Sequence, residues 1–535
     1  MPPATPAMPT PRAELLARLA QEQVVDIAVV GGGATGLGVA LDAAARGLRV
    51  VLVESHDFAK GTSSRATKLV HGGVRYLAQG NIGLVREALH ERTTLLHNAP
   101  YLAQPLAFVI PSYHWWEIPF YGAGLAAYDL LAGKAGLGRT ELIGKTRTQA
   151  LLPSVRPEGL KGGIKYWDGQ FNDARLALAL ARTAALHGAL LVNYCRADGL
   201  LYEAGQVAGV QCVDTLTGTS YRVRAQCVVN AAGVWVDALR THDSPAHQAL
   251  GGAPVKPMVA PSQGAHLVVD RDFLGSDTAL MVPKTSDGRV LFAVPWLGKV
   301  ILGTTDTPRM DLDREPLAFD EEVAFILGES ARYLRRPPCR ADVRSIWVGL
   351  RPLVKPQSDS VEATKAISRE HTVLVSRSGL VTVTGGKWTT YRAMAEDVLS
   401  TCVAHGLVVT GVASRTGHLH LVGSGGSGHD APVSISAPPG LHSYGVEAPQ
   451  VAALPGATSV LCDGLSEAMV RFAARYEYAV TVEDMLARRS RLLFLDARAA
   501  LGLADRVAAI LQQETRLDPQ TQAFKVLAEQ YFLVP

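Results

Sequence analysis

Cysteine and net charge are both scarce in this chain of 535 residues. None of the six cysteines forms a C-x-x-C pair, so neither a disulfide scaffold nor a zinc site is indicated. Lys and Arg number 52 against 49 Asp and Glu, a net charge of +3. Proteins that bind nucleic acid by releasing counterions are usually far more basic. We therefore expect reduced thiols, no metal and no nucleic-acid partner.

The chain also lacks the apolar segments of secreted and membrane-spanning proteins. Residues 1–11 carry five prolines and no apolar core, which argues against a signal peptide. Runs of about 18 apolar residues do not occur, so we expect no transmembrane helix. Charged residues make up only 19% of the chain and hydrophobic residues 48%, which excludes a largely disordered protein. This length predicts roughly three or four domains or lobes.

A dinucleotide-binding motif follows the first apolar run, Val24–Val30. Gly31, Gly33 and Gly36 have the G-x-G-x-x-G spacing, which permits a tight turn, backbone approach to a pyrophosphate and close packing of helix on strand. Glu54 ends the next predicted strand and is placed to bind the adenosine ribose. The alternative is an ordinary Gly-rich turn of an α/β sheet that binds no cofactor. The motif alone does not separate FAD from NAD.

Further motifs resemble those of one flavoprotein family. They are GTSSRATKLVHGGVRYL (61–77), NAAGVW (230–235), GTTD (303–306), GLRPL (349–353) and GGKWTTYR (385–392). Together they resemble the FAD-dependent, membrane-associated sn-glycerol-3-phosphate dehydrogenases, in the wider group of D-amino-acid oxidases. The resemblance covers roughly residues 24–400 and 465–510.

This resemblance implies a mixed α/β (α+β) architecture. We expect a Rossmann-like FAD-binding domain of the D-amino-acid-oxidase/glutathione-reductase type, a β-rich substrate or cap domain and a helical C-terminal domain. The predicted boundaries are a disordered leader with a short helix (1–20), the FAD-binding domain (21–95, 150–250 and 345–410), the cap (96–149 and 251–344), a linker (423–440) and the C-terminal domain (441–535).

Four groups of residues are candidates for holding FAD without a covalent link. Hydroxyls and an amine suited to the pyrophosphate and ribityl chain come from Thr62, Ser63, Ser64 and Lys68. His71, Gly72 and Gly73 offer a flat ring and bare backbone to the isoalloxazine. Close backbone approach to the adenosine half is expected at Ala231, Ala232 and Gly233. Gly385 and Gly386 precede a helix and present N–H groups to the flavin O2 side, with the cation Lys387 beside them.

A phosphorylated substrate needs fixed cations: Arg binds phosphate through two parallel hydrogen bonds, and Lys binds it as a point charge. The resemblance implies that Arg351 and Arg369 hold the phosphate, with Lys387 near substrate and flavin. Arg75 and Tyr76 are candidates to complete the pocket. The alternative for any single arginine is a structural ion pair.

The expected reaction removes a proton from the C2 hydroxyl while hydride passes from C2 to flavin N5. A histidine base suits this step because its ordinary pKa is about 6.5. His266 is our first candidate and His71 our second, with Lys387 and Arg351 also in the catalytic set. A structural histidine on a strand is the alternative for His266.

An aromatic segment, Thr93–Gly133, has only two formal charges and four prolines that preclude a single spanning helix. Its aromatics are Tyr101, Phe108, Tyr113, Trp115, Trp116, Phe120, Tyr121 and Tyr128. Tyr and Trp favour membrane interfaces, so we expect this segment to contact a membrane. The family resemblance implies peripheral attachment to the cytoplasmic side of the inner membrane. A buried subdomain is the alternative.

The resemblance implies an enzyme that converts sn-glycerol 3-phosphate to dihydroxyacetone phosphate and passes electrons to a membrane quinone. An oxidase using O₂ is the second enzyme hypothesis. A flavin-binding protein without turnover would lack the cations Arg351, Arg369 and Lys387. The sequence does not distinguish a monomer from a homodimer.

Overall fold

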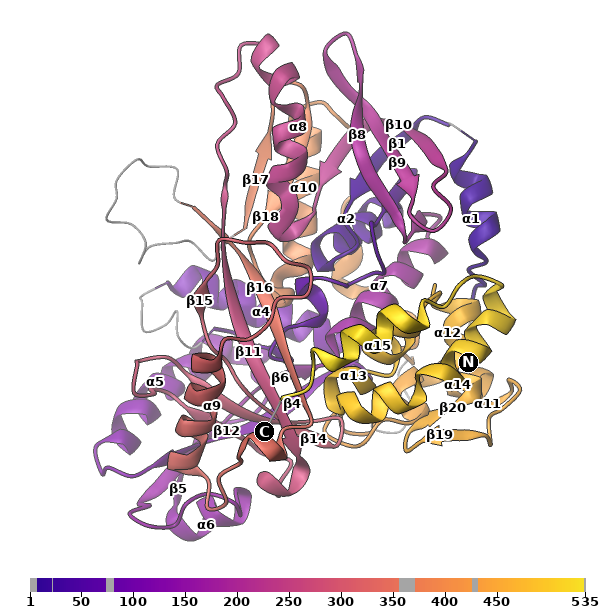
Figure 1. The fold of residues 1–535 in the computed structure, drawn as a ribbon. Coiled ribbons are helices and arrows are strands. Elements are labelled where there is room, and N and C mark those ends of the chain that lie inside the picture. Colours follow the sequence, from indigo (N-terminus) through magenta and orange to yellow (C-terminus); the bar gives the residue numbers. More distant parts are fainter. Residues whose placement is uncertain (1–6, 22, 74–80, 356–370, 426–431, 534–535) are drawn as a thin grey trace.

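Two sheets and a helical C-terminal domain make up the computed structural model, which describes residues 7–21, 23–73, 81–355, 371–425 and 432–533 (Figure 1). The first sheet has the order β17 (Thr372–Val375), β18 (Leu380–Thr384), β10 (Ser220–Asn230), β1 (Val25–Val30), β2 (Val50–Val53), β7 (Leu190–Val192). All neighbours on this path are parallel except β17, which is antiparallel to β18. Strands buried on both faces need continuous apolar sequence, as the buried residues IAVV of β1 and VVLV of β2 provide.

Three helices pack together beside this sheet: α2 (Ala34–Ala45), α7 (Asp173–Leu186) and α10 (Tyr391–Ala404). Alanine and glycine on α2 let its neighbours approach closely, and the helix is almost wholly buried. An antiparallel meander of β8 (Cys195–Glu203) and β9 (Gln206–Asp214) extends the first half of β10. This is the predicted Rossmann-like unit, with an N-terminal helix α1 (Arg12–Leu19) whose Leu15 and Leu19 are buried.

The second sheet is mostly antiparallel. Its path is β15 (Thr307–Pro308), β11 (Val259–Asp270), β14 (Lys299–Gly303), β13 (Leu291–Trp296), β12 (Ala279–Val282), β4 (Ala103–Ser112), β6 (Gly162–Phe171), β3 (Leu69–Val70). Off this path, β16 (Ser345–Val354) pairs with β11 and β5 (Glu141–Gly144) with β6. Strands β6 and β16 come from segments that the predicted boundaries give to the FAD-binding domain. Each pairs along ten residues with a strand of the cap, which carries the sheet across that boundary.

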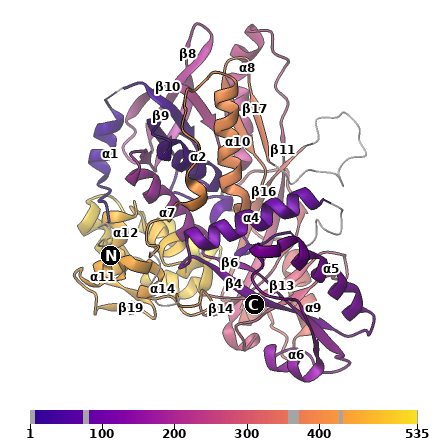
Figure 2. The same cartoon turned by 180° about the vertical axis from the view of Figure 1, so that it is seen from behind.

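Helices surround the second sheet: α4 (Ile82–Asn98), α5 (Glu117–Ala132), α6 (Lys145–Leu151) and α9 (Asp320–Tyr333). Helix α4 lies between the two sheets when the molecule is seen from behind (Figure 2). It contacts β4 of the second sheet and the turn η7 (Trp388–Thr390) beside the first. Helix α8 (Val236–Ala249) follows β10 and packs on β18.

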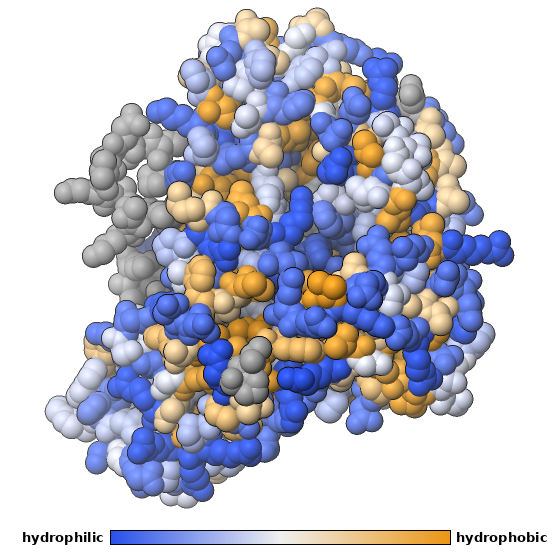
Figure 3. Space-filling view, in the orientation of Figure 1, coloured by the Kyte–Doolittle hydropathy of each residue, from blue (hydrophilic) through white to orange (hydrophobic). Residues whose placement is uncertain are grey.

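The C-terminal domain is helical, as predicted. It contains α11 (Ala448–Ala452), a short hairpin of β19 (Val460–Cys462) and β20 (Leu465–Ser466), α12 (Glu467–Tyr476), a π-helical turn η10 (Asp484–Arg489), α13 (Leu492–Leu495), α14 (Ala497–Thr515) and α15 (Thr521–Glu529). Phe472, Phe494 and Phe524 lie in its core. The predicted linker contacts the second sheet, because Leu297 N and Gly298 N donate to Ile435 O and Ser436 O at 2.9 and 3.0 Å. Hydrophilic residues with apolar ones interspersed cover the face shown in Figure 3.

Candidate active site

A cavity of about 480 Å³ opens at the carboxyl ends of the parallel strands β1, β2 and β18. Ligands of open parallel sheets bind at this edge, where the strand order reverses around β1. Its lining comes from the glycine turn after β1, the segment after β2, the start of β8, the segment after β10 and the turn after β18. Among the predicted cofactor residues, those lining it are Gly31, Gly33, Glu54, Thr62, Ser63, Ala231, Ala232, Gly233, Gly385, Gly386 and Lys387.

The glycine turn has little room for side chains. Gly31 has φ +112°, and a Cβ there would lie 2.6 Å from the carbonyl oxygen of Ala231. A Cβ on Gly36 would overlap the carbonyl oxygen of Gly31. Gly33 caps the N-terminus of α2, and its Cβ would lie 3.0 Å from Ser63 Oγ. The tight turn therefore requires glycine at Gly31 and Gly36. At Gly33, the missing side chain leaves the backbone exposed to the cavity.

Glu54 fixes this turn as well as facing the cavity. Its Oε2 accepts from Gly32 N at 2.6 Å, and its Oε1 accepts from His56 N at 2.9 Å and Ser55 Oγ at 3.0 Å. The carboxylate is thus held at the end of β2, where the sequence predicts a ribose acceptor. Its bond to the turn was not foreseen.

The predicted hydroxyl cluster divides into two. Thr62 and Ser63 line the cavity, and Ser63 Oγ accepts from Ala34 N in the first turn of α2 at 2.9 Å. Ser64 and Lys68 are buried and are not among the lining residues. The Lys68 ammonium contacts Asp173 at 2.6 Å and Ser64 O at 2.8 Å instead, and burial lowers the Lys68 pKa to about 7. The structure therefore gives these two a supporting position behind the wall.

The His71–Gly73 turn passes between the second sheet and the helices α4 and α5. Gly72 N donates to Asp168 Oδ1 at 3.3 Å, and a Cβ on Gly72 would overlap the Tyr128 hydroxyl. His71 is half-buried, and Gly73 has φ +79°. The candidates Arg75, Tyr76 and Arg369 lie outside the described residues.

The last cavity wall is the turn Gly385–Lys387, where β18 leads into α10. Gly385 and Gly386 have φ of +84° and +70°, conformations that favour glycine. The following residue, Trp388, donates from Nε1 to Ser63 O at 2.9 Å. This bond joins two walls that are far apart in the sequence, and Lys387 lines the cavity between them.

Arg351 lies on β16 next to the cavity-lining Pro352. Its guanidinium donates to Asp306 Oδ1 and Thr305 O, both at 2.9 Å, and to Gln263 O at 3.1 Å. Its side chain is 27% exposed. Arg351 is therefore an oriented cation that still reaches solvent. It is paired with Asp306 and is not among the residues that line the cavity.

His266 lies in the middle of β11 and is 2% exposed. Its ring stacks on Trp347 with centroids 4.0 Å apart, and its Nε2 is 2.9 Å from Thr67 Oγ1. Burial, followed by the charges of Lys68 and Arg351, holds the His266 pKa well below its ordinary value. The imidazole is thus neutral at pH 7. It is not among the residues that line the cavity.

Sequence reasoning missed several lining residues. Arg196 and Asp198 come from β8, His242 from α8, and Arg314 from the segment before α9. The Arg314 guanidinium lies 4.8 Å from the ring centroid of Trp235. Trp235 could have been found, since it ends the Ala-Ala-Gly motif. The others follow no local motif, and only long-range packing brings them to the cavity.

The aromatic segment is partly buried and partly exposed. Phe108 and Tyr128 are in the core. Trp115, Trp116 and Phe120, in the turn before α5 and on its first turn, are 78%, 46% and 66% exposed. Among the described helices, none is both long and apolar enough to cross a membrane.

Comparisons with known proteins agree with this architecture. The family model described as FAD dependent oxidoreductase matches residues 26–392, and that of the C-terminal domain of alpha-glycerophosphate oxidase matches 437–522. The mitochondrial glycerol-3-phosphate dehydrogenase of Homo sapiens is 40% identical over 95% of this chain and 73% of its own length. The Arabidopsis thaliana mitochondrial enzyme is 38% identical over 98% and 89%. The X-ray structure of glycerol-3-phosphate dehydrogenase from Bacillus halodurans complexed with FAD has TM-score 0.75 and 28% identity, covering 97% of both chains.

Proposed function

Because this chain belongs to the FAD-dependent glycerol-3-phosphate dehydrogenases, we propose that it oxidises sn-glycerol 3-phosphate to dihydroxyacetone phosphate with FAD bound in the cavity. The observation that carries this proposal is the cavity wall itself. It combines the glycine turn, Glu54 and the Gly385–Lys387 turn at the carboxyl edge of the sheet.

The residues present fit FAD. The bare backbone at Gly33 and the N-terminus of α2 suit a pyrophosphate, and Glu54 suits a ribose. Ser63 and Thr62 stand beside them. Bound FAD supplies the hydride acceptor for the reaction. The protein's own contribution is to bind and orient both molecules and to hold the proton released from the C2 hydroxyl.

Among the described residues, Arg351 is the proposed phosphate-binding cation, with Lys387 near the substrate and the flavin. Arg351 is held by Asp306 and two backbone carbonyls, so it loses little side-chain freedom on binding a phosphate. Lys387 lines the cavity where the flavin end of FAD is expected. Arg369, Arg75 and Tyr76 stay candidates from the sequence for the same pocket.

His266 remains our first candidate for the base. Side chains alternate along a strand, so His266 and Gly264 share one face of β11. A Cβ on Gly264 would overlap the Arg351 guanidinium, which places Arg351 on that face too. The neutral imidazole can accept a proton there. His71, half-buried beside Gly72, is the second candidate.

The proposed electron acceptor is a quinone, with the enzyme attached peripherally to the inner membrane, on the cytoplasmic side, through Trp115, Trp116 and Phe120. Their exposure supports a contact with the headgroup region, where aromatic rings are favoured.

Anaerobic titration of the purified flavoprotein tests the proposed reaction. sn-Glycerol 3-phosphate should bleach the oxidised flavin, whereas glycerol and unrelated polyol phosphates should not. Bleaching by another polyol phosphate in preference to sn-glycerol 3-phosphate would assign a different substrate. Under air, a low peroxide yield with rapid quinone reduction is expected, and stoichiometric peroxide would identify an oxidase instead.

A further inference from the structure

The loop 54–68, here called the cavity loop, has two sides that face different parts of the protein. Its inner side lines the cavity through Glu54, Ser55, Ala59, Lys60, Gly61, Thr62 and Ser63. Its outer side meets the C-terminal domain at residues 477–491, here called the arginine segment. This contact involves no residue of the proposed substrate set.

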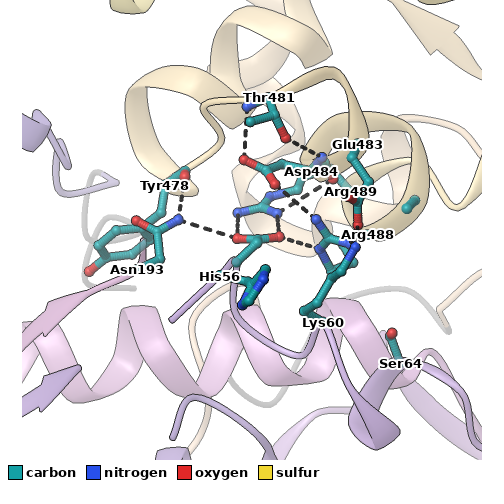
Figure 4. A network of polar contacts seen from close by, with 12 residues as sticks. His56, Lys60, Ser64, Asn193, Tyr478, Thr481, Glu483, Asp484, Arg488 and Arg489 are labelled. Carbon is teal, nitrogen blue, oxygen red and sulfur yellow. Dashed lines mark hydrogen bonds and ion pairs between the residues drawn. The ribbon is translucent and has the colours of Figure 1, made fainter. Parts of the chain in front are cut away.

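Asp57 is the centre of that contact. Figure 4 shows its partners Arg488, Arg489 and Asn193 pointing toward one another. Its carboxylate is completely buried and accepts from both Arg488 and Arg489, with Arg489 Nη2 to Asp57 Oδ1 at 2.9 Å. Asn193 Nδ2 donates to the same oxygen at 3.3 Å. Burial alone would raise the pKa of Asp57, but the two guanidiniums outweigh it and hold that pKa below its ordinary value. Asp57 is therefore a fixed anion.

The residues next to Asp57 touch the glycine turn directly. Ala59 N donates to Gly32 O at 2.9 Å. The Phe58 ring lies so close to Gly32 that a Cβ there would be 2.6 Å from it. The other side of Phe58 packs edge-to-face on Tyr478, with centroids 5.2 Å apart. A shift of Asp57 would thus reach the turn expected to hold the pyrophosphate.

Two more bonds join the arginine segment to the cavity loop. Lys60, which lines the cavity, has its ammonium 2.5 Å from Glu483 and 2.8 Å from Glu315. Arg491 Nη2 donates to Ser64 O at 2.7 Å, just after the cavity-lining Ser63. One segment of the C-terminal domain consequently holds the loop at three points, Asp57, Lys60 and Ser64.

The charges in this contact balance: Lys60, Arg488, Arg489 and Arg491 accompany Asp57, Glu315, Glu483 and Asp484. Removing so many charges from water is costly, and buried ion networks often add little stability compared with apolar packing. Stability alone is thus a weak reason for this arrangement. A network with directional bonds does fix geometry, which a binding site needs from its supporting residues.

We propose that the arginine segment is a positioning element for FAD, which holds the cavity loop in its binding conformation through Arg488 and Arg489. Without it, the loop would have to be ordered when FAD binds, and affinity would fall by that cost. The C-terminal domain would then act on FAD affinity although none of its residues is among those lining the cavity.

Arg489→Lys tests this, because it keeps a cation and removes the two-pronged contact with Asp57. The matched control is Arg182→Lys, which breaks another buried fork between the same two parts: Arg182 on α7 binds Glu447, just before α11, at 2.6 and 2.7 Å. Its contact with the arginine segment is the longer approach to Glu477 at 3.9 Å, where lysine keeps the charge. Full-length holoenzymes are compared by FAD dissociation constant and by Tm with and without saturating FAD. We expect Arg489→Lys to weaken FAD binding about tenfold or more, which is the size of effect seen when a residue that orients a metal ligand is changed. The FAD-dependent rise in Tm should become smaller as well.

The difference between Tm with FAD and Tm without FAD distinguishes a positioning role from a purely stabilising one. That difference depends on the FAD dissociation constant, because a ligand stabilises the folded protein according to how tightly it binds. Arg182→Lys should lower both Tm values equally and leave FAD affinity within about twofold. The same pattern in Arg489→Lys would overturn the proposal. If Arg489→Lys does not fold, Glu483→Gln replaces it, since Glu483 is 22% exposed and contacts both Lys60 and Arg488. Unchanged FAD affinity in that variant would equally refute the idea.

Discussion

At the scale of single residues, the phosphate role of Arg351 makes the sharpest prediction. Arg351→Ala should raise the KM for sn-glycerol 3-phosphate while FAD stays bound. Losing the partner of a bound charge costs about 2–5 kcal/mol, and the 27% exposure of Arg351 favours the lower end. A cost of about 2 kcal/mol corresponds to a roughly 30-fold rise.

Steady-state kinetics with sn-glycerol 3-phosphate and glycerol measure this effect. Glycerol lacks the phosphate, so its kcat/KM should hardly change. The ratio of kcat/KM for sn-glycerol 3-phosphate to that for glycerol should therefore fall in Arg351→Ala. Asp306→Asn is the control, because it removes the ion pair at 2.9 Å and leaves the guanidinium in place. An equal loss on both substrates, or loss of FAD, would make Arg351 structural.

His266 supports a second prediction at this scale. His266→Gln should lower kcat by about 10²–10⁴-fold if the imidazole is the base, with the flavin absorption retained. Burial holds its pKa below 6.5, so it stays neutral as the pH falls through that value. The acid limb of kcat in the wild type should accordingly have its midpoint below pH 6.5. A midpoint at or above 6.5, or a comparable loss only in His71→Gln, would transfer the role to His71.

Residue types predict chemistry better than they predict position. Ser63 and Ser64 look equivalent in the sequence, yet Ser63 lines the cavity and Ser64 does not. Lys68 looks like a cofactor ligand, and the structure pairs it with Asp173 on α7. Asp173 is 105 residues away in the chain, so local sequence carries no sign of this partner.

At the scale of elements, local periodicity predicted much of the fold. The first apolar run, Val24–Val30, forms β1 at Val25–Val30, and Glu54, expected at the end of the next strand, directly follows β2 at Val50–Val53. The π-helical turn at Asp484–Arg489 is different. Its Arg488 and Arg489 form buried ion pairs with Asp57, a distant residue that no helix pattern reveals.

The glycine turn between β1 and α2 gives the prediction that belongs to this scale. Gly33→Val should abolish FAD retention, because the new side chain would meet Ser63 Oγ and occupy the wall left bare for the pyrophosphate. Acid precipitation of the wild type should release its flavin, as expected for a non-covalent cofactor. Gly502→Val on α14, where a Cβ would meet no atom within 4 Å, is the control and should stay yellow. A yellow Gly33→Val protein would contradict this placement of FAD.

At the scale of the whole molecule, the family, the overall architecture and the FAD cofactor predicted from the sequence are confirmed by the comparisons. The motifs sufficed because each is a contiguous stretch of sequence. The glycine turn, NAAGVW and GGKWTTYR follow β1, β10 and β18 at the carboxyl edge of the first sheet, whereas GTTD begins at the end of β14 and GLRPL lies in β16, both in the second. The predicted domain boundaries were less informative about sheet membership: β6 and β16 enter the cap sheet by pairing with β4 and β11. Strand pairing over such distances depends on the global fold rather than on local pattern.

The outer surface at α5 carries the last prediction, on membrane attachment. Trp115→Ser with Trp116→Ser should reduce sedimentation with vesicles of anionic phospholipid, while turnover with a soluble dye is unchanged. Both rings are exposed, at 78% and 46%, so their loss should cost the folded core little. Val409→Ser with Val460→Ser removes two exposed apolar side chains, at 88% and 62%, that belong to other elements, the segment after α10 and β19, and should leave partitioning as in the wild type. Equal sedimentation of all three proteins would mean that these tryptophans do not anchor the enzyme. A loss in both variants would indicate general surface hydrophobicity instead.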